Sequence, residues 1–248
     1  MHRRLDSMTR YRLGFLLCDH VTGALGARFG DYPAMFEQAF ATTGAALDWR
    51  VYDATAGQLP AHPQDCDGYL VSGSRHGAYE PWPWIAPLEQ RLRDIVAAGR
   101  PLVGICFGHQ VLAQALGGEV RQAAQGWGLG IKAYTVTTTE AFMQPPLARV
   151  HVPVCHQDQV TRLPPAARVL AASEHCPCFA VRYTEHALGI QGHPEFSPDY
   201  LGALIDSRRD TLPPPVRDSA VASLATSHDN DAVKRWILCF LGVTEART

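Results

Sequence analysis

One short segment of this 248-residue sequence has the residue types and spacing of a nucleophile turn, Gly104-Ile105-Cys106-Phe107-Gly108. It matches the G-x-S-x-G nucleophile elbow with sulfur in place of the hydroxyl, and it stands between a predicted strand and a predicted helix, as that motif requires. Such a turn strains the backbone of the nucleophile, so the residues two positions away must lack crowding side chains. Gly104 and Gly108 meet that need. Cys106 then lies at the start of a helix, whose dipole favours the reactive thiolate.

An alternative interpretation is that Cys106 is one more small buried residue packed between glycines. Cysteine is among the most buried residue types, so for an arbitrary cysteine this interpretation would be the better one. Here the elbow spacing and its strand-to-helix context favour a nucleophile.

A cysteine nucleophile in acyl transfer needs a base and a group that orients the base. The late segment Gly192-His193-Pro194-Glu195 supplies both, because residues two apart in an extended chain point to the same side. Glu195 can therefore hold the ring of His193. His156 and Asp158, which are also two residues apart, form a rival pair of base and orienting group.

Three separated segments together resemble the signature motifs of class I glutamine amidotransferases, the family with a Cys-His-Glu triad. They are Gly104-Ile105-Cys106-Phe107-Gly108-His109-Gln110, Gly192-His193-Pro194-Glu195 and Ser72-Gly73-Ser74, and the resemblance covers about residues 12–205. Val154-Cys155-His156-Gln157-Asp158-Gln159-Val160 also resembles a stretch of the GMP synthase amidotransferase domain, with Cys155 in place of a serine. The chain is similar as well to single-domain γ-glutamyl peptidases of this family.

The resemblance implies a role for each matching residue. Cys106, His193 and Glu195 form the catalytic triad, and the backbone N–H groups of Gly73 and Phe107 form the oxyanion hole. The substrate-binding residues it implies are Gln110 and His156. It implies no metal and no cofactor.

The resemblance implies an amidohydrolase that cleaves the γ-carboxamide of L-glutamine through a cysteinyl thioester, giving glutamate and ammonia. A synthetase or acceptor subunit is then a possible partner, because the sequence has no recognisable ATP-binding loop. The first alternative is a γ-glutamyl peptidase or hydrolase that acts on larger γ-glutamyl amides. The second is a non-catalytic regulatory or binding protein, which an intact triad argues against.

The elements that must position these residues alternate in the first half of the chain, as in βαβ units with a parallel sheet. Helical spacing and end signals predict helices over about 32–43, 84–98 and 109–116, and a mostly helical tail from Pro198 with a break at Pro213. Strands are expected at 13–18, 47–52, 68–71, 101–106, 169–172, 179–183 and 187–190, with antiparallel strands between 131 and 154. We expect Trp82 and Trp84, which lie between prolines, to pack against the protein.

Together these patterns predict an α/β fold: a mostly parallel central sheet flanked by helices, with added antiparallel strands. By resemblance it is flavodoxin-like, the class I glutamine amidotransferase fold. We expect one domain over 1–248, with a core at about 12–205 and a helical C-terminal extension at about 206–248.

Composition limits the possible partners and compartment. The sequence is 46% hydrophobic and 19% charged, with a formal charge of −2 and no basic cluster, so we expect a small-molecule substrate and no nucleic acid. No apolar run approaches the roughly 20 residues of a membrane span. The basic segment Met1–Arg12 precedes an apolar stretch too short for a signal peptide. Seven cysteines, an odd number without a C-x-x-C pair, favour reduced thiols and a cytoplasmic location.

Overall fold

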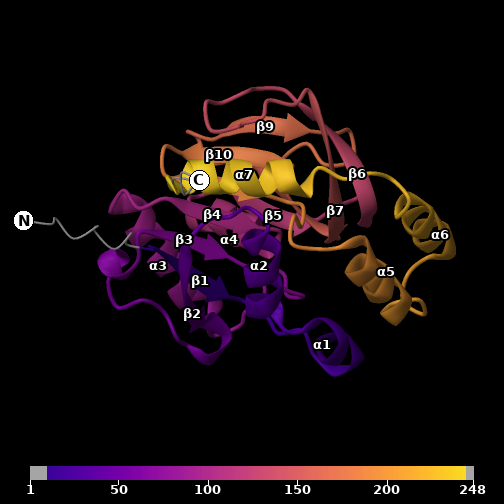
Figure 1. Ribbon diagram of the computed structural model, residues 1–248, viewed down its shortest axis with the longest axis horizontal. Coiled ribbons are helices and arrows are strands. Elements are labelled where there is room, and N and C mark those ends of the chain that lie inside the picture. The colour runs from indigo at the N-terminus through magenta and orange to yellow at the C-terminus, as the bar shows by residue number, and fades with distance from the viewer. Residues whose placement is uncertain (1–9, 244–248) are drawn as a thin grey trace, which may run out of the picture.

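The computed structural model describes residues 10–243, so most of the basic N-terminal segment lies outside the described residues. At its centre is a nine-stranded sheet with the order β2-β1-β3-β4-β11-β10-β9-β6-β7 (Figure 1). The first five strands in this order pair in parallel: β2 Leu47–Asp53, β1 Tyr11–Leu17, β3 Gly68–Val71, β4 Leu102–Ile105 and β11 Ala187–Ile190. The other four are antiparallel: β10 Ala180–Thr184, β9 Arg168–Ala172, β6 Gly128–Val136 and β7 Arg149–His156. The predicted sheet is confirmed.

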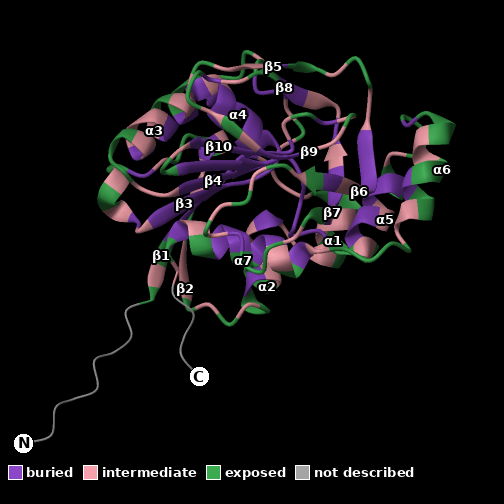
Figure 2. Cartoon of the chain, turned by 90° about the horizontal axis from the view of Figure 1, so that it is seen from above, coloured by how far each residue is buried: buried purple, intermediate pink, exposed green. Residues whose placement is uncertain are grey.

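Helices cover both faces of this sheet (Figure 2). One face carries α2 Tyr32–Ala41 and α7 Asn230–Leu241, and the other carries α3 Ile85–Ala97 and α4 Phe107–Ala115. Strand β1 shows why two layers form, because Leu13 and Phe15 join the core under α2, while Leu16 joins the core under α3. All three are fully buried, and each such side chain contributes about 1.5–3 kcal/mol through removal from water.

The C-terminal helices pack on the sheet and on α2. Helix α5 Pro198–Ser207 begins at Ser197, whose hydroxyl accepts a hydrogen bond from the Tyr200 N–H, and α6 Pro214–Ser223 begins in the predicted proline break. Ser223 accepts a hydrogen bond from the N–H of Ile131 in β6. In α7 the ammonium of Lys234 donates to the Ala39 carbonyl at the end of α2. Residues 206–243 therefore contribute to the hydrophobic core.

The predicted helices and strands are present, with ends shifted by a few residues. Sequence patterns did not predict α1 Gly23–Phe29 or the separate antiparallel pair β5 Glu119–Gln122 and β8 Asp158–Arg162. Two short 3-10 turns, Ala54–Ala56 and Pro63–Asp65, connect strands in the first half. No helix between residues 10 and 243 combines the length and the apolar character needed to cross a membrane.

Candidate active site

Cys106 occupies the junction between β4 and α4 in a strained conformation. Its φ of 52° and ψ of −103° make it the one non-glycine residue with positive φ in the described part of the chain. Such strain persists only where the surrounding structure enforces it, and it is concentrated at functional sites. The thiol stands at the N-terminal end of α4, where the helix dipole stabilises negative charge.

Close packing explains the two glycines of the elbow. A Cβ atom on Gly104 would lie 2.3 Å from the Gly108 carbonyl oxygen, and one on Gly108 would lie 2.4 Å from the carbonyl oxygen of Val71. Both contacts are with backbone atoms, which cannot move aside. The tight crossing of β4, α4 and β3 therefore requires glycine at both positions.

Sheet pairing brings the distant histidine to the thiol. Strand β11 lies parallel to β4 with Ile190 opposite Ile105, and the Cys106 N–H donates to the Ile190 carbonyl at 2.8 Å. The chain leaving β11 reaches His193, which lines the same cavity as Cys106 and is close enough for the thiol to act on the pKa of its ring. The structure thus brings together two residues that are 87 positions apart in the sequence.

Glu195 holds the other side of this ring. Its Oε1 lies 2.7 Å from His193 Nδ1, and the two side chains are 0% and 4% exposed, respectively. Burial alone lowers the pKa of His193, but the charges of Glu195 and Cys106 outweigh it and hold that pKa well above its ordinary value. The arrangement favours the protonated, imidazolium form of His193.

The rival pair has a different arrangement. His156 Nδ1 lies 3.2 Å from the backbone oxygen of Asp158, while the Asp158 carboxylate accepts a hydrogen bond from Tyr79. Burial lowers the pKa of His156 to about 3, so this ring is neutral. An imidazole that is both held by a carboxylate and protonated is therefore found at His193 and not at His156.

The two candidate oxyanion-hole residues flank the thiol. Gly73 follows β3, and a Cβ atom placed on it would lie 2.9 Å from His193 Cε1 and 3.8 Å from Cys106 Cβ. Phe107 is the first residue of α4, where backbone N–H groups have no acceptor within the helix. Both residues are thus next to the sulfur, from the ends of two neighbouring strands.

Gln110 lies on the first turn of α4 and is buried. Its side-chain amide donates to the Asp158 backbone oxygen at 2.8 Å and to Gln191 Oε1 at 3.1 Å. These bonds fix the glutamine side chain one helical turn beyond Cys106. Gln110 and His156 both line the cavity that also contains Cys106 and His193.

The sulfur of Cys106 opens into a cavity of about 590 Å³. One wall is formed by the loop after β3 and by Gln110 and Asp158, and another by the segment that follows Glu195. This second wall follows one side of α5 and the segments that flank it, in steps of about one helical turn apart from one adjacent pair: Phe196, Tyr200, Leu204, Ser207, Arg208 and Thr211. Sequence analysis missed this wall, although its regular spacing directly after the Gly192–Glu195 motif is a usable signal.

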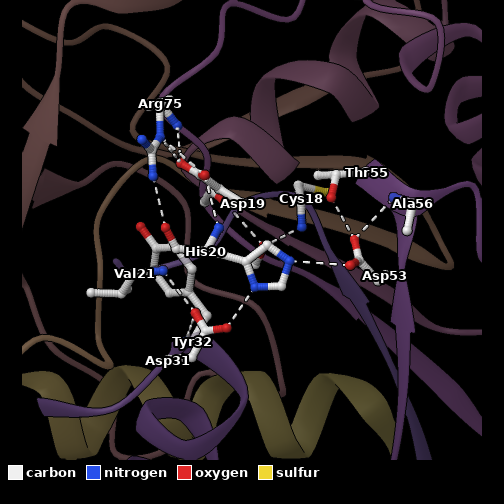
Figure 3. A network of polar contacts seen from close by, with 12 residues as sticks. Cys18, Asp19, His20, Val21, Asp31, Tyr32, Asp53, Thr55, Ala56 and Arg75 are labelled. Carbon is white, nitrogen blue, oxygen red and sulfur yellow. Dashed lines mark hydrogen bonds and ion pairs between the residues drawn. The ribbon is translucent and has the colours of Figure 1, made fainter. Parts of the chain in front are cut away.

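A polar network fixes the rim of the cavity contributed by the loop after β1 (Figure 3). The His20 ring bridges two carboxylates, with Nδ1 at 2.6 Å from Asp31 and Nε2 at 3.1 Å from Asp53. Asp19 is held by Arg75, whose Nε lies 2.8 Å from its Oδ2. These bonds connect the loop after β1 to the loop that carries Gly73.

In the part of the chain that the structure describes, no group of three His, Cys, Asp or Glu side chains has the arrangement of a metal site.

The chain belongs to the class I glutamine amidotransferase family, whose model matches residues 30–205. The predicted family and fold class are thereby confirmed. Relatives include γ-glutamyl peptidase 3 of Arabidopsis thaliana, which is 29% identical over 82% of this chain and 83% of its own length. The GMP synthase of Thermomicrobium roseum is 34% identical over 56% of this chain and 25% of its own length. These matches support a hydrolytic or amidotransferase enzyme.

Solved structures agree on the fold. A glutamine amidotransferase from Thermotoga maritima superposes with a TM-score of 0.71 at 21% identity, covering 94% of this chain and 98% of the other. At that level of identity the likeness concerns the fold alone.

Proposed function

We propose that this protein hydrolyses γ-glutamyl amides whose leaving group is larger than ammonia, through a thioester on Cys106. The observation that carries the proposal is the strained Cys106 against the His193–Glu195 pair at the base of a large cavity. The similarity to named γ-glutamyl peptidases supports the choice of substrate class.

The reaction follows from these groups. The Cys106 thiolate attacks the γ-carbonyl carbon, and the N–H groups of Gly73 and Phe107 receive the negative oxygen. The carbon–nitrogen bond breaks as the His193 imidazolium gives its proton to the departing nitrogen, leaving a glutamyl thioester and a free amine. His193 then takes a proton from water, whose oxygen displaces the sulfur. The products are glutamate and the amine, and the thiolate–imidazolium pair is restored.

The shape of the cavity argues for a substrate longer than glutamine. The wall formed by α5 runs on from the triad segment for ten residues, or about 15 Å of helix. Ammonia, the leaving group of glutamine, needs no such wall. An amine that carries its own side chain and carboxylate does.

A second candidate function is glutamine hydrolysis that supplies ammonia to an acceptor enzyme. The match to the GMP synthase of Thermomicrobium roseum, a protein named as glutamine-hydrolysing, favours it. The non-catalytic alternative has no such support, since a chain without turnover has no physical need for a strained thiol facing an oriented imidazole.

A substrate panel tests the proposal. Purified protein is given glutamine, γ-glutamyl dipeptides and γ-glutamyl alkylamides, and glutamate release is measured for each, with mass spectrometry of the protein to detect a glutamyl adduct on Cys106. We expect kcat/KM for the larger amides to exceed that for glutamine by at least tenfold. A preference for glutamine would select the second candidate, and no release from any substrate would contradict both.

We also propose a cytoplasmic location, because an odd number of cysteines without a C-x-x-C pair favours reduced thiols. We propose further that residues 1–248 form a single domain, as expected from the sequence.

A further inference from the structure

We propose that Arg208 binds a carboxylate on the leaving group, which makes γ-glutamyl peptides with a free C-terminus the preferred substrates. This inference rests on the proposed function and deepens it by naming the chemistry of the departing amine.

The position of Arg208 is the first argument. It lines the same cavity as Cys106 and His193, and its Nη1 donates to Cys155 Sγ at 3.2 Å. Cys155 lines this cavity too, and the His193 N–H donates to the carbonyl of Pro153, two residues before Cys155 in β7. The guanidinium and the proposed reacting groups therefore share one cavity.

The side of the cavity is the second argument. His193 must face the leaving nitrogen in order to protonate it, so the rest of the leaving group extends along the wall next to His193. That wall contains Cys155, Tyr200 and Arg208, and the His193 N–H is bonded to the Pro153 carbonyl on the same strand as Cys155. The Gln110 and Asp158 wall is left for the glutamyl half.

The unused hydrogen-bonding capacity of Arg208 is the third argument. Among residues 10–243 no carboxylate forms an ion pair with it, whereas its neighbour Arg209 pairs with Asp206 at 3.1 Å and Arg75 pairs with Asp19 at 2.8 Å. A guanidinium has five donors in a planar fork, and the Cys155 thiol, a weak acceptor, takes one of them. The guanidinium carbon also lies 5.9 Å from the centre of the Trp127 ring, within the range of a cation–π contact. A carboxylate matches such a fork with two parallel hydrogen bonds.

The charges that line the cavity favour the same orientation of a γ-glutamyl peptide. Glu80 and the partly buried Asp158 line it together with Tyr79, and neither carboxylate is paired with Arg208. A γ-glutamyl peptide has an ammonium at its glutamyl end and a carboxylate at its other end. The acidic groups complement the ammonium of the glutamyl end, and Arg208 complements the carboxylate of the other end.

The test compares each peptide with its C-terminal amide, which lacks the carboxylate charge at that end. Wild-type protein, Arg208→Gln and Arg208→Lys are assayed on γ-Glu-Ala against γ-Glu-alaninamide, and on γ-Glu-Ala-Gly against its C-terminal amide. In at least one pair, wild type should prefer the carboxylate, and Arg208→Gln should reduce the ratio of the two kcat/KM values by about 10- to 100-fold, the range for a charge-assisted hydrogen bond. Arg208→Lys should restore part of that ratio. The pair that responds tells how far the carboxylate lies from the scissile bond.

Arg209→Gln is the matched control, because Arg209 is adjacent, exposed and absent from the cavity lining. It should leave the ratio at the wild-type value. If Arg208→Gln lowers both members of every pair equally, Arg208 is merely structural and the inference is wrong. The same conclusion follows if wild type does not distinguish carboxylate from amide.

A binding measurement separates this inference from the proposed function. Calorimetry with Cys106→Ala, which cannot form the thioester, should show tighter binding of γ-Glu-Ala or γ-Glu-Ala-Gly than of its amide, and the added Arg208→Gln change should remove the difference. Selective binding without any turnover by wild type would overturn the proposed function and leave Arg208 as a carboxylate site. Turnover without selective binding would overturn the Arg208 assignment alone.

Discussion

The Nδ1 atom of His193 lies 2.7 Å from Oε1 of Glu195, and both side chains are almost completely removed from solvent. This short contact fixes the orientation of the ring, which in the proposed mechanism leaves its other nitrogen for the proton transfers at Cys106. It also means that the charge of Glu195 acts on the imidazole without screening by water.

Changing Glu195 to Ala should lower kcat/KM on the order of 10²- to 10⁴-fold while leaving measurable turnover, because an orienting carboxylate contributes less than the nucleophile. Since Glu195 raises the pKa of His193, its loss should also move the alkaline limb of the pH–rate profile to lower pH. The kcat/KM of Glu195→Gln, which keeps an acceptor but not the charge, should lie between those of wild type and Glu195→Ala. Wild-type activity in Glu195→Ala combined with loss in Asp158→Ala would show that the wrong orienting group has been chosen.

Changing Cys106 to Ala should remove all γ-glutamyl hydrolysis and leave the thermal unfolding midpoint within a few degrees of wild type, because the thiol contributes chemistry and little packing. Mass spectrometry should find no glutamyl adduct in this variant. Cys178→Ala, which changes a half-buried thiol that does not line the cavity, is the control and should keep both activity and adduct. Hydrolysis that survives in Cys106→Ala would refute the nucleophile assignment.

Changing Gly73 to Ala should lower kcat on the order of 10²-fold without unfolding the protein. The new methyl group would lie 2.9 Å from His193 Cε1, so the ring must move, and a shift of about 1 Å at a reacting group has an effect of this size. Gly202→Ala in α5 is the control, because its methyl group meets the flexible end of Leu224 at 3.2 Å. Equal kcat for the two variants would show that Gly73 does not constrain the site.

Replacing His20 with Asn should destabilise the protein more at acidic than at alkaline pH. The hydrogen bond to Asp31 is the main cause that raises the pKa of His20; burial lowers it, and Asp53 adds to the rise. A folded-state pKa above the unfolded value of about 6.5 stabilises the fold fully below that value, and the contribution is lost as pH rises through the folded pKa.

Thermal unfolding of wild type and His20→Asn at pH 5.5 and pH 9 measures this contribution. The difference in midpoint should be larger at pH 5.5, and 1 M salt should reduce it, because the His20 side chain is 42% exposed. Arg75 faces the same loop, and its hydrogen bond to Asp19 raises its pKa further above its ordinary value, so it stays charged at both pH values and should not contribute to the change. A midpoint difference that is the same at both pH values would contradict the ion-pair role of His20.

The local parts of the site could be predicted from the sequence because local spacing encodes local geometry. Glycines two residues on either side of Cys106 specify a tight strand-to-helix turn, and a carboxylate two residues after His193 specifies a contact on one side of an extended chain. Alternating and helical periodicities likewise predicted most of the sheet and the helices around it. The packing expected of the two tryptophans is found at both, although Trp82 stays 46% exposed: its ring lies 4.7 Å from that of His76 and donates to Glu80, while Trp84 is buried.

The tertiary structure alone decided which distant residues share the cavity. Arg208, Trp127 and Cys155 have no motif that links them, and they meet only because β6, β7 and the end of α5 converge beside the triad. The bridge of His20 to Asp31 and Asp53 likewise joins three separate segments. The type of reaction is therefore determined by adjacent residues that the sequence displays, whereas the size and charge of the space available to the leaving group depend on long-range packing, which no local pattern specifies.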